Sequence, residues 1–276
     1  MKRKTLHRLL RGLAFAAIFA WSLFPILLVV SASFKPARDI FAVPPRLLFS
    51  PTLANYAELF RLWPEFTRTL WNSLLITLGA TGLTVLASAL AGWVYSRQRS
   101  RALTASAFFM VLIRMFPPIV ITLPLFPVVN ALRLNDTHVV LVILYAAFFG
   151  SLGTWIMKAF IDQVPRELEE AAAVDGATVW QTLRRVVFPL VVPGMTAAAV
   201  FVFIFAWNEF LFAFVFTTSK ARTAPLIISE MLGSVTGVDW GAVFAAATLQ
   251  LVPIIVFVAL LQRHLIAGLS AGATKG

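Results

Sequence analysis

The chain has 276 residues, of which 60% are hydrophobic and only 13% charged, and its mean hydropathy is +0.87. A soluble domain of this length carries about twice that charged fraction, so the composition excludes one and indicates a single membrane domain. The net charge of +11 is then expected to lie mostly on the cytoplasmic side, facing anionic lipid. The absence of cysteine excludes disulfides, thiolate metal sites and cysteine nucleophiles.

Six runs are apolar enough and long enough to cross a bilayer, which takes about 20 residues. In chain order they cover residues 12–30, 71–96, 103–132, 139–157, 186–218 and 240–262. The sequence therefore predicts an all-α membrane protein with six transmembrane helices.

The first apolar run has two interpretations. Lys2, Arg3 and Lys4 before an apolar stretch, with small residues at 30–32, are also typical of a cleaved signal peptide. The run is longer than a signal core and contains Trp21 and Pro25, which favours an uncleaved helix.

The orientation follows from the distribution of Lys and Arg. With the N-terminus in the cytoplasm, the cytoplasmic segments hold 14 of these residues and the outer segments 8, and the SRQRSR turn at 96–101 lies inside. Both termini are then cytoplasmic, and the two main outer loops cover residues 34–70 and 219–239.

This topology places residues 161–188 in the cytoplasm, between the fourth and fifth spans. Pro165 can begin a helix over 166–174, because its missing N–H is not needed there. Gly176 permits a sharp turn, and Thr178 is suited to cap a second helix over 179–187 before Pro189 marks the passage into the membrane. The alanines between these signals leave room for the close approach of another protein.

Residues 170–189, EAAAVDGATVWQTLRRVVFP, closely resemble the EAA signature of ABC-importer permeases, with Phe188 where the family usually has Leu. The resemblance implies a type I ABC importer permease fold. It also implies that this segment docks onto an ATP-hydrolysing subunit and couples nucleotide-driven closure to permease motion. The implied coupling residues are Glu170, Ala171, Ala172, Asp175, Gly176 and Ala177.

The rest of the chain resembles the carbohydrate-uptake branch of this family, and within it the maltose-type G permeases. The stretches that carry the likeness include PTLANY at 51–56, LNDT at 134–137, AWNEF at 206–210 and the tail GLSAGATKG at 268–276. The implied organisation is a first helix at 1–34, an outer loop at 35–69, a permease core at 70–263 that includes the loop 161–188, and a cytoplasmic tail at 264–276. The tail residues expected to contact the ATPase are Gly272, Lys275 and Gly276.

The resemblance further implies a set of partners in a bacterial or archaeal cytoplasmic membrane. They are a second permease, two ATP-binding subunits that hold ATP and Mg, and an outer solute-binding protein. The loop 219–239 is expected to probe that binding protein through Gly233, Ser234, Thr236 and Gly237. No nucleic acid is expected as a partner.

Four polar or aromatic residues within the spans are candidates for the translocation pathway: Trp207, Asn208, Glu209 and Arg114. Charge within a span is costly and usually faces a cavity or a partner, so Glu209 either lines the pathway, pairs with Arg114 or lies near the outer interface. Trp207 suits either sugar stacking or packing. The third span holds four prolines, which predict a kinked helix along the pathway: Pro117, Pro118, Pro124 and Pro127.

The sequence contains no P-loop, no metal-ligand spacing and no nucleophile elbow, so no enzyme, no metal site and no cofactor of its own is expected. The favoured function is the permease subunit of an ATP-driven sugar importer. The alternatives are a permease of the same family for glycerol-phosphate or another polar solute, a stand-alone secondary carrier, and a membrane scaffold. A carrier is disfavoured because Glu209 is the only carboxylate within a span and no repeat is seen.

Overall fold

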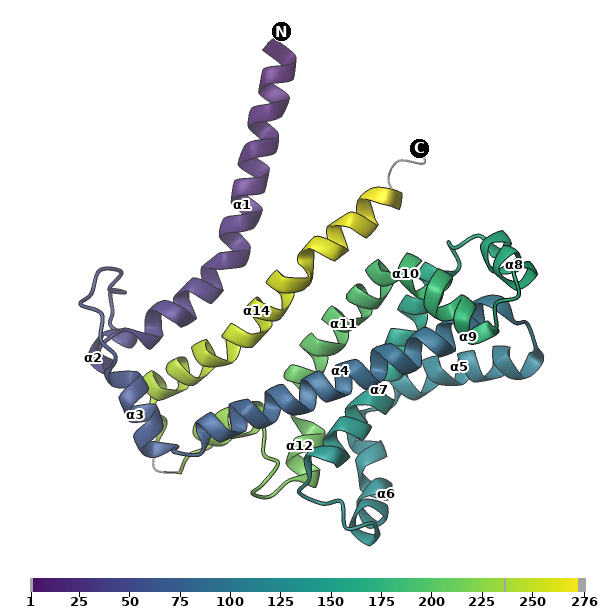
Figure 1. The fold of residues 1–276 in the computed structure, drawn as a ribbon. Helices are drawn as coiled ribbons and strands as arrows, with labels where there is room; N and C mark the ends of the chain where they lie inside the picture. Colours follow the sequence, from purple (N-terminus) through teal and green to yellow (C-terminus); the bar gives the residue numbers. More distant parts are fainter. Residues whose placement is uncertain (1, 236, 273–276) are drawn as a thin grey trace. The chain divides into compact units, whose positions relative to one another are not determined.

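A computed structural model describes the backbone of residues 2–235 and 237–272, and the side chains of 7–235 and 237–262. In these ranges the secondary structure is helical, without strands (Figure 1). The helices are α1 (Lys2–Ser33), α2 (Ala37–Ile40), α3 (Ala54–Leu62), α4 (Phe66–Arg97), α5 (Arg101–Met115), α6 (Pro118–Ala131), α7 (His138–Ile161), α8 (Arg166–Val174), α9 (Val179–Thr182), the π-helix η1 (Leu183–Val187), α10 (Phe188–Leu190), α11 (Val192–Trp207), α12 (Leu211–Phe216), α13 (Ala224–Leu232) and α14 (Trp240–Gly272).

Helices of membrane-spanning length account for the predicted spans. Four are long and apolar enough alone: His7–Ser33, Phe66–Arg97, His138–Ile161 and Trp240–Gln262. Two bent pairs, α5 with α6 and α9–α10 with α11, raise the number to six among the described residues if each pair counts as one span. The all-α membrane architecture predicted from composition is confirmed.

The third span is broken where the sequence predicts only a kink. The axes of α5 and α6 differ by 100°, with Phe116 and Pro117 between them. Two successive prolines lack backbone donors, and each drives the preceding residue out of the helical region, so that Phe116 is extended at ψ 135°. Pro118 then begins α6, while Pro124 and Pro127 are accommodated within it.

The chain divides into two compact units, one formed by residues 1–67 and 227–252, the other by 68–226 and 253–276. In the first, the buried side-chain amide of Asn55 in α3 donates to the backbone oxygens of Ser33 and Lys35, both at 2.8 Å. Ser33 also bonds the Tyr56 hydroxyl at 2.8 Å. The end of α1 is therefore fixed to α3.

In the second unit, α7 is the central helix, and glycines set its distances to two neighbours. A Cβ on Gly92 of α4 would lie 2.8 Å from the backbone nitrogen of Lys158, and one on Gly153 of α7 would lie 2.5 Å from the Ser88 hydroxyl. Because residue numbers rise together along the contact, α4 and α7 run parallel, side by side in Figure 1.

Helix α11 packs on α7 in the opposite direction. A Cβ on Gly194 would lie 2.5 Å from the ring of Phe160, while Phe205 near the other end of α11 stacks on Phe149. A buried cluster at the Ile161 end of α7 includes residues of α4, α7, η1 and α11, namely Val85, Ala89, Met157, Ile161, Val164, Leu183, Val187, Val191 and Ala198. The segment between the fourth and fifth spans thus packs against α4, α7 and α11.

Candidate functional site: the EAA segment

Residues 161–188, here called the EAA segment, form the helix, turn and second helix that the sequence predicts. Helix α8 covers Arg166–Val174 directly after Pro165, and α9 begins at Val179. Thr178 accepts a hydrogen bond from the Gln181 N–H through its side chain, and the Gln181 side chain accepts one from the Thr178 N–H at 2.8 Å. This capping box satisfies two of the N–H groups that an uncapped helix start leaves unpaired.

The turn after α8 explains the glycine of the signature. The Ala177 N–H bonds the Ala172 oxygen and the Gly176 N–H bonds the Ala173 oxygen, both at 3.0 Å. This pair of bonds is the Schellman motif, in which the residue after the helix cap adopts a left-handed conformation. Gly176 has φ +80°, a value that costs a residue with a Cβ about 1–2 kcal/mol.

The segment continues into the fifth span through a π-helix, which the sequence does not predict. Residues Leu183–Val187 form η1, and Leu183 and Val187 are buried. The chain then bends by 75° between α10 and α11 around Val191, with Pro189 and Pro193 on either side. The EAA segment is therefore joined to α11 through η1, α10 and a single bend in the backbone.

The predicted coupling residues form one surface. Glu170, Ala171, Asp175 and Gly176 are exposed, and Ala172 and Ala177 are partly exposed. The two carboxylates flank small residues on a helix and turn whose shape is fixed by backbone bonds.

Glu169, just before the signature, has a different environment that the sequence analysis missed. Its Oε1 accepts from Nε of Arg97 at 2.7 Å and its Oε2 accepts from Nε1 of Trp93 at 2.9 Å. The side chains of Arg97 and Glu169 are only 10% and 15% exposed. We call Trp93, Arg97 and Glu169 the α4–α8 tether. The SRQRSR turn indicated a basic cluster at the end of α4, but nothing local in the sequence paired Arg97 with Glu169.

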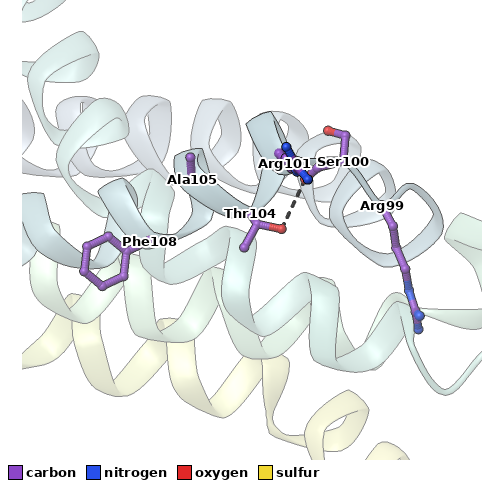
Figure 2. Close-up of a pocket in the computed structure, with 6 residues that line it drawn as sticks. All are labelled: Arg99, Ser100, Arg101, Thr104, Ala105 and Phe108. Atoms are coloured by element: carbon purple, nitrogen blue, oxygen red, sulfur yellow. Dashed lines mark hydrogen bonds between the residues drawn. The ribbon is translucent and has the colours of Figure 1, made fainter.

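A shallow hollow lies beside this region, at the start of α5. Figure 2 shows it lined by Arg99, Ser100, Arg101, Thr104, Ala105 and Phe108. Arg99 lies at one end and the Phe108 ring at the other, so basic and apolar groups share one surface. None of the predicted pathway residues lines it.

The predicted pathway residues are found in three different settings. Trp207 is buried and stacks parallel to Phe203 at 5.8 Å, whereas Asn208 is exposed and donates to the Ile204 oxygen. The Glu209 carboxylate accepts from the Phe212 N–H at 3.0 Å and so caps α12. Arg114 is exposed at the end of α5, and in the described part of the chain no ion pair joins it to Glu209.

The outer loop begins at a second anchor that the sequence analysis did not single out. The carboxylate of Asp136, between α6 and α7, accepts from the backbone N–H groups of the four residues Thr218, Ser219, Lys220 and Ala221 at 2.9–3.2 Å. Desolvation works against the charged form, but these four donors outweigh it and hold the pKa of Asp136 well below its ordinary value. Asn72 of α4 donates to the oxygens of Lys220 and Arg222, both at 2.9 Å.

The remaining predicted residues lie in the outer loop and the tail. Gly233, Ser234 and Gly237 follow α13, where Ser234 and Gly237 line a hollow with Leu62, Trp63, Met231 and Asp239. Thr236 lies outside the described residues. Gly272 ends α14, and Lys275 and Gly276 also lie outside the described residues.

Residues 84–270 match the family model of the binding-protein-dependent transport system inner membrane component. The chain therefore belongs to this family of membrane-embedded permeases, in agreement with the resemblance seen in the sequence. Two relatives are permeases of named sugar transport systems. The chain is 38% identical over 267 residues to the trehalose transport system permease protein SugB of Mycobacterium tuberculosis, covering 94% of each chain. It is 33% identical over 279 residues to the trehalose/maltose transport system permease protein MalG of Thermococcus litoralis, covering 100% of each.

The fold is shared with a solved transporter. A chain from the crystal structure of a bacterial ABC transporter that imports the acidic polysaccharide alginate superposes with a TM-score of 0.75 at 18% identity, covering 95% of this chain and 98% of that one. At this identity the likeness shows the type I permease fold alone.

Proposed function

We propose that this chain is one of two permease subunits of an ATP-driven sugar importer and that its EAA segment receives the power stroke from an ATPase subunit. The observation that carries the proposal is the exposed surface from Glu170 to Ala177, held in shape by a Schellman turn and a capping box. The named relatives transport trehalose or maltose, which favours a sugar as the cargo.

The power source lies in another subunit. The sequence holds no Gly-x-x-x-x-Gly-Lys-Ser/Thr run, so ATP and Mg are bound by the partner ATPases. Glu170 and Asp175 are proposed to present their carboxylates to the ATPase, and the small residues between them permit close contact. The tail residues Gly272, Lys275 and Gly276 are proposed to reach the same partners.

On the outer side, the loop 219–239 is proposed to meet the solute-binding protein. Four backbone bonds to Asp136 and two from Asn72 fix its first residues, so a push on the loop is passed to α4 and α7. The small residues Gly233, Ser234 and Gly237, with Thr236 among them, suit entry into a cleft of that protein.

The predicted pathway residues divide into two with a structural contact and two that are exposed in the single chain. Trp207 is buried by stacking on Phe203, and Glu209 is used in capping α12. Asn208 and Arg114 are the exposed members of the predicted set and the better candidates for the pathway. Both termini are proposed to be cytoplasmic, with Arg99, Arg101 and the apolar Phe108 facing the headgroups and first acyl carbons of anionic lipid (Figure 2).

The test uses single substitutions in the assembled transporter. Glu170→Lys reverses the charge of the docking surface, and Gly176→Pro removes the N–H that closes the turn and forbids its φ of +80°. Both are expected to abolish uptake while membrane insertion stays intact. Glu167→Lys, on an exposed position of the same helix outside the signature, is the matched control.

The outcomes separate the candidate functions. Loss of uptake together with loss of the co-purifying ATPase supports the proposal. Unchanged uptake in both variants refutes the role of the EAA segment and favours a stand-alone carrier. Screening the co-purified binding protein against sugars, glycerol-phosphate and other polar solutes then identifies the cargo.

A further inference from the structure

The α4–α8 tether joins two helix faces with complementary groups. Trp93 and Arg97 are four residues apart, and so lie on one face of α4. Arg166 and Glu169 are three apart on one face of α8, and Arg166 donates from Nη2 to the Ser96 oxygen at 3.2 Å. The start of α8 therefore contacts the last turn of α4 through two side chains.

Each side-chain nitrogen and oxygen of the tether takes part in at least one hydrogen bond. Besides Glu169, Arg97 donates from Nη2 to the Val164 oxygen at 2.9 Å and from Nη1 to the Ser96 hydroxyl at 3.1 Å. Both carboxylate oxygens of Glu169 are bonded. Removing one partner would leave a nearly buried charge without its counterpart, which is the most damaging way to break such a pair.

The tether lies between the exposed signature and the membrane spans. Glu169 is adjacent to Glu170, which is exposed. Trp93 follows Gly92, whose close contact with the backbone of Lys158 fixes α4 against α7. A displacement of α8 would thus be passed through these contacts directly to α4 and α7. This path is separate from the one that follows the backbone through Pro189 into α11.

We infer that Glu169 is a positioning residue for transport, which makes α8 move as one body with α4. This inference rests on the proposed function, because it assigns a path to the force that enters at Glu170–Ala177. Glu169 itself is directed into the protein and does not take part in docking the ATPase. The tether stays closed throughout the cycle and transmits force without changing partners.

The experiment is made on the whole transporter in proteoliposomes, with its two permeases, ATPases and binding protein. The variants are Glu169→Gln, Arg97→Gln and the exchange of charges Glu169→Arg with Arg97→Glu. Glu167→Gln is the control, because Glu167 is exposed on the same helix. Three quantities are measured for each: the ATPase that co-purifies, the rate of ATP hydrolysis, and the solute taken up per ATP.

For each single variant we expect the ATPase to remain bound and hydrolysis to continue, while uptake per ATP falls by about tenfold, because a nearly buried partner is lost. The exchanged pair is expected to recover a large part of the uptake per ATP, since the ion pair is rebuilt in reverse. Glu167→Gln is expected to behave as the wild type.

Three results would overturn the inference. The first is unchanged uptake per ATP in both single variants. The second is loss of the ATPase in step with uptake, which would place Glu169 in docking or folding. The third is no recovery in the exchanged pair. Failure of the proposed function looks different, because the wild-type chain would then retain no ATPase at all.

Discussion

Gly176 offers a test of why the signature contains a glycine. Two physical reasons are possible in principle: room for a partner, or the left-handed backbone of the Schellman turn. In the chain alone, a Cβ on Gly176 would meet no atom within 4 Å, whereas φ is +80°. We therefore expect backbone conformation to decide which substitutions are tolerated.

The expected order follows from the cost of that conformation. Alanine at 176 costs about 1–2 kcal/mol, and valine costs more because its branched side chain is a strong outlier at positive φ. Asparagine costs less than alanine, since it adopts this region several times more often than most residues. If conformation decides, the order of stability is Gly, Asn, Ala and Val, although Asn is larger than Ala.

The measurement is amide hydrogen exchange in the isolated permease, which removes any effect of the docked partner. The Ala177 N–H, bonded to the Ala172 oxygen, reports opening of the turn directly. A cost of about 1–2 kcal/mol corresponds to roughly 5–30-fold faster exchange for Gly176→Ala. Gly82→Ala is the control, because its Cβ also meets no atom and its backbone is helical.

A reversed order would refute this reasoning. The reasoning would also fail if Gly176→Ala exchanged like the wild type in the isolated chain and, in the assembled transporter, Gly176→Asn alone lost the ATPase. Small size at the docking surface would then be the requirement. The Schellman geometry would in that case be a consequence of the glycine and not the reason for it.

Three further predictions concern the ends of α7. Gly194→Ala places a methyl group 2.5 Å from the Phe160 ring and should destabilise the protein by about 1–3 kcal/mol in thermal unfolding, whereas Gly150→Ala, with no atom in reach, should not. Asp136→Asn removes the charge that holds four backbone N–H groups and should speed trypsin cleavage after Lys220 severalfold, with cleavage after the exposed Arg46 unchanged. Because the pKa of Asp136 is lower in the fold than in the unfolded chain, its stabilisation is complete above the ordinary aspartate pKa and is lost as the pH falls through the lowered value. The protection factors of this turn, which correct exchange for its intrinsic pH dependence, should therefore be the same at about pH 8 and about pH 5. A lower protection factor at about pH 5 than at about pH 8 would contradict that assignment.

Local signals were sufficient to predict the EAA segment from sequence. Pro165, Gly176 and Thr178 each act on backbone groups within five residues, so their effects do not depend on the rest of the fold. The six apolar runs could also be predicted from the sequence, because a membrane helix pairs its backbone N–H and C=O groups within the segment itself.

The interactions that hold this segment and the outer loop could not be predicted in the same way. Arg97 and Glu169 are separated by 72 residues, and Asp136 and Ala221 by 85. Their pairing depends on which helices are neighbours, and an isolated sequence does not contain this information. The local role of Glu209 was not predicted either: a carboxylate in a span suggests a distant charge, whereas in the structure it accepts hydrogen bonds from the N–H group of Phe212 in the next helical turn.

The arrangement of these anchors has a consequence for how the two faces of the membrane communicate. The EAA segment and the Asp136 turn lie at opposite ends of α7, whose 24 residues span about 36 Å. At one end α7 is fixed to α4 beside Gly92 and to α11 at Gly194; at the other, Asn72 of α4 and Asp136 hold the start of the outer loop. Helices packed at backbone contact cannot deform independently, because any tilt of one forces its neighbour to follow. A push on α8 is therefore expected to reach the outer loop as a rigid tilt of α4 and α7, and not as a local rearrangement of residues inside the membrane.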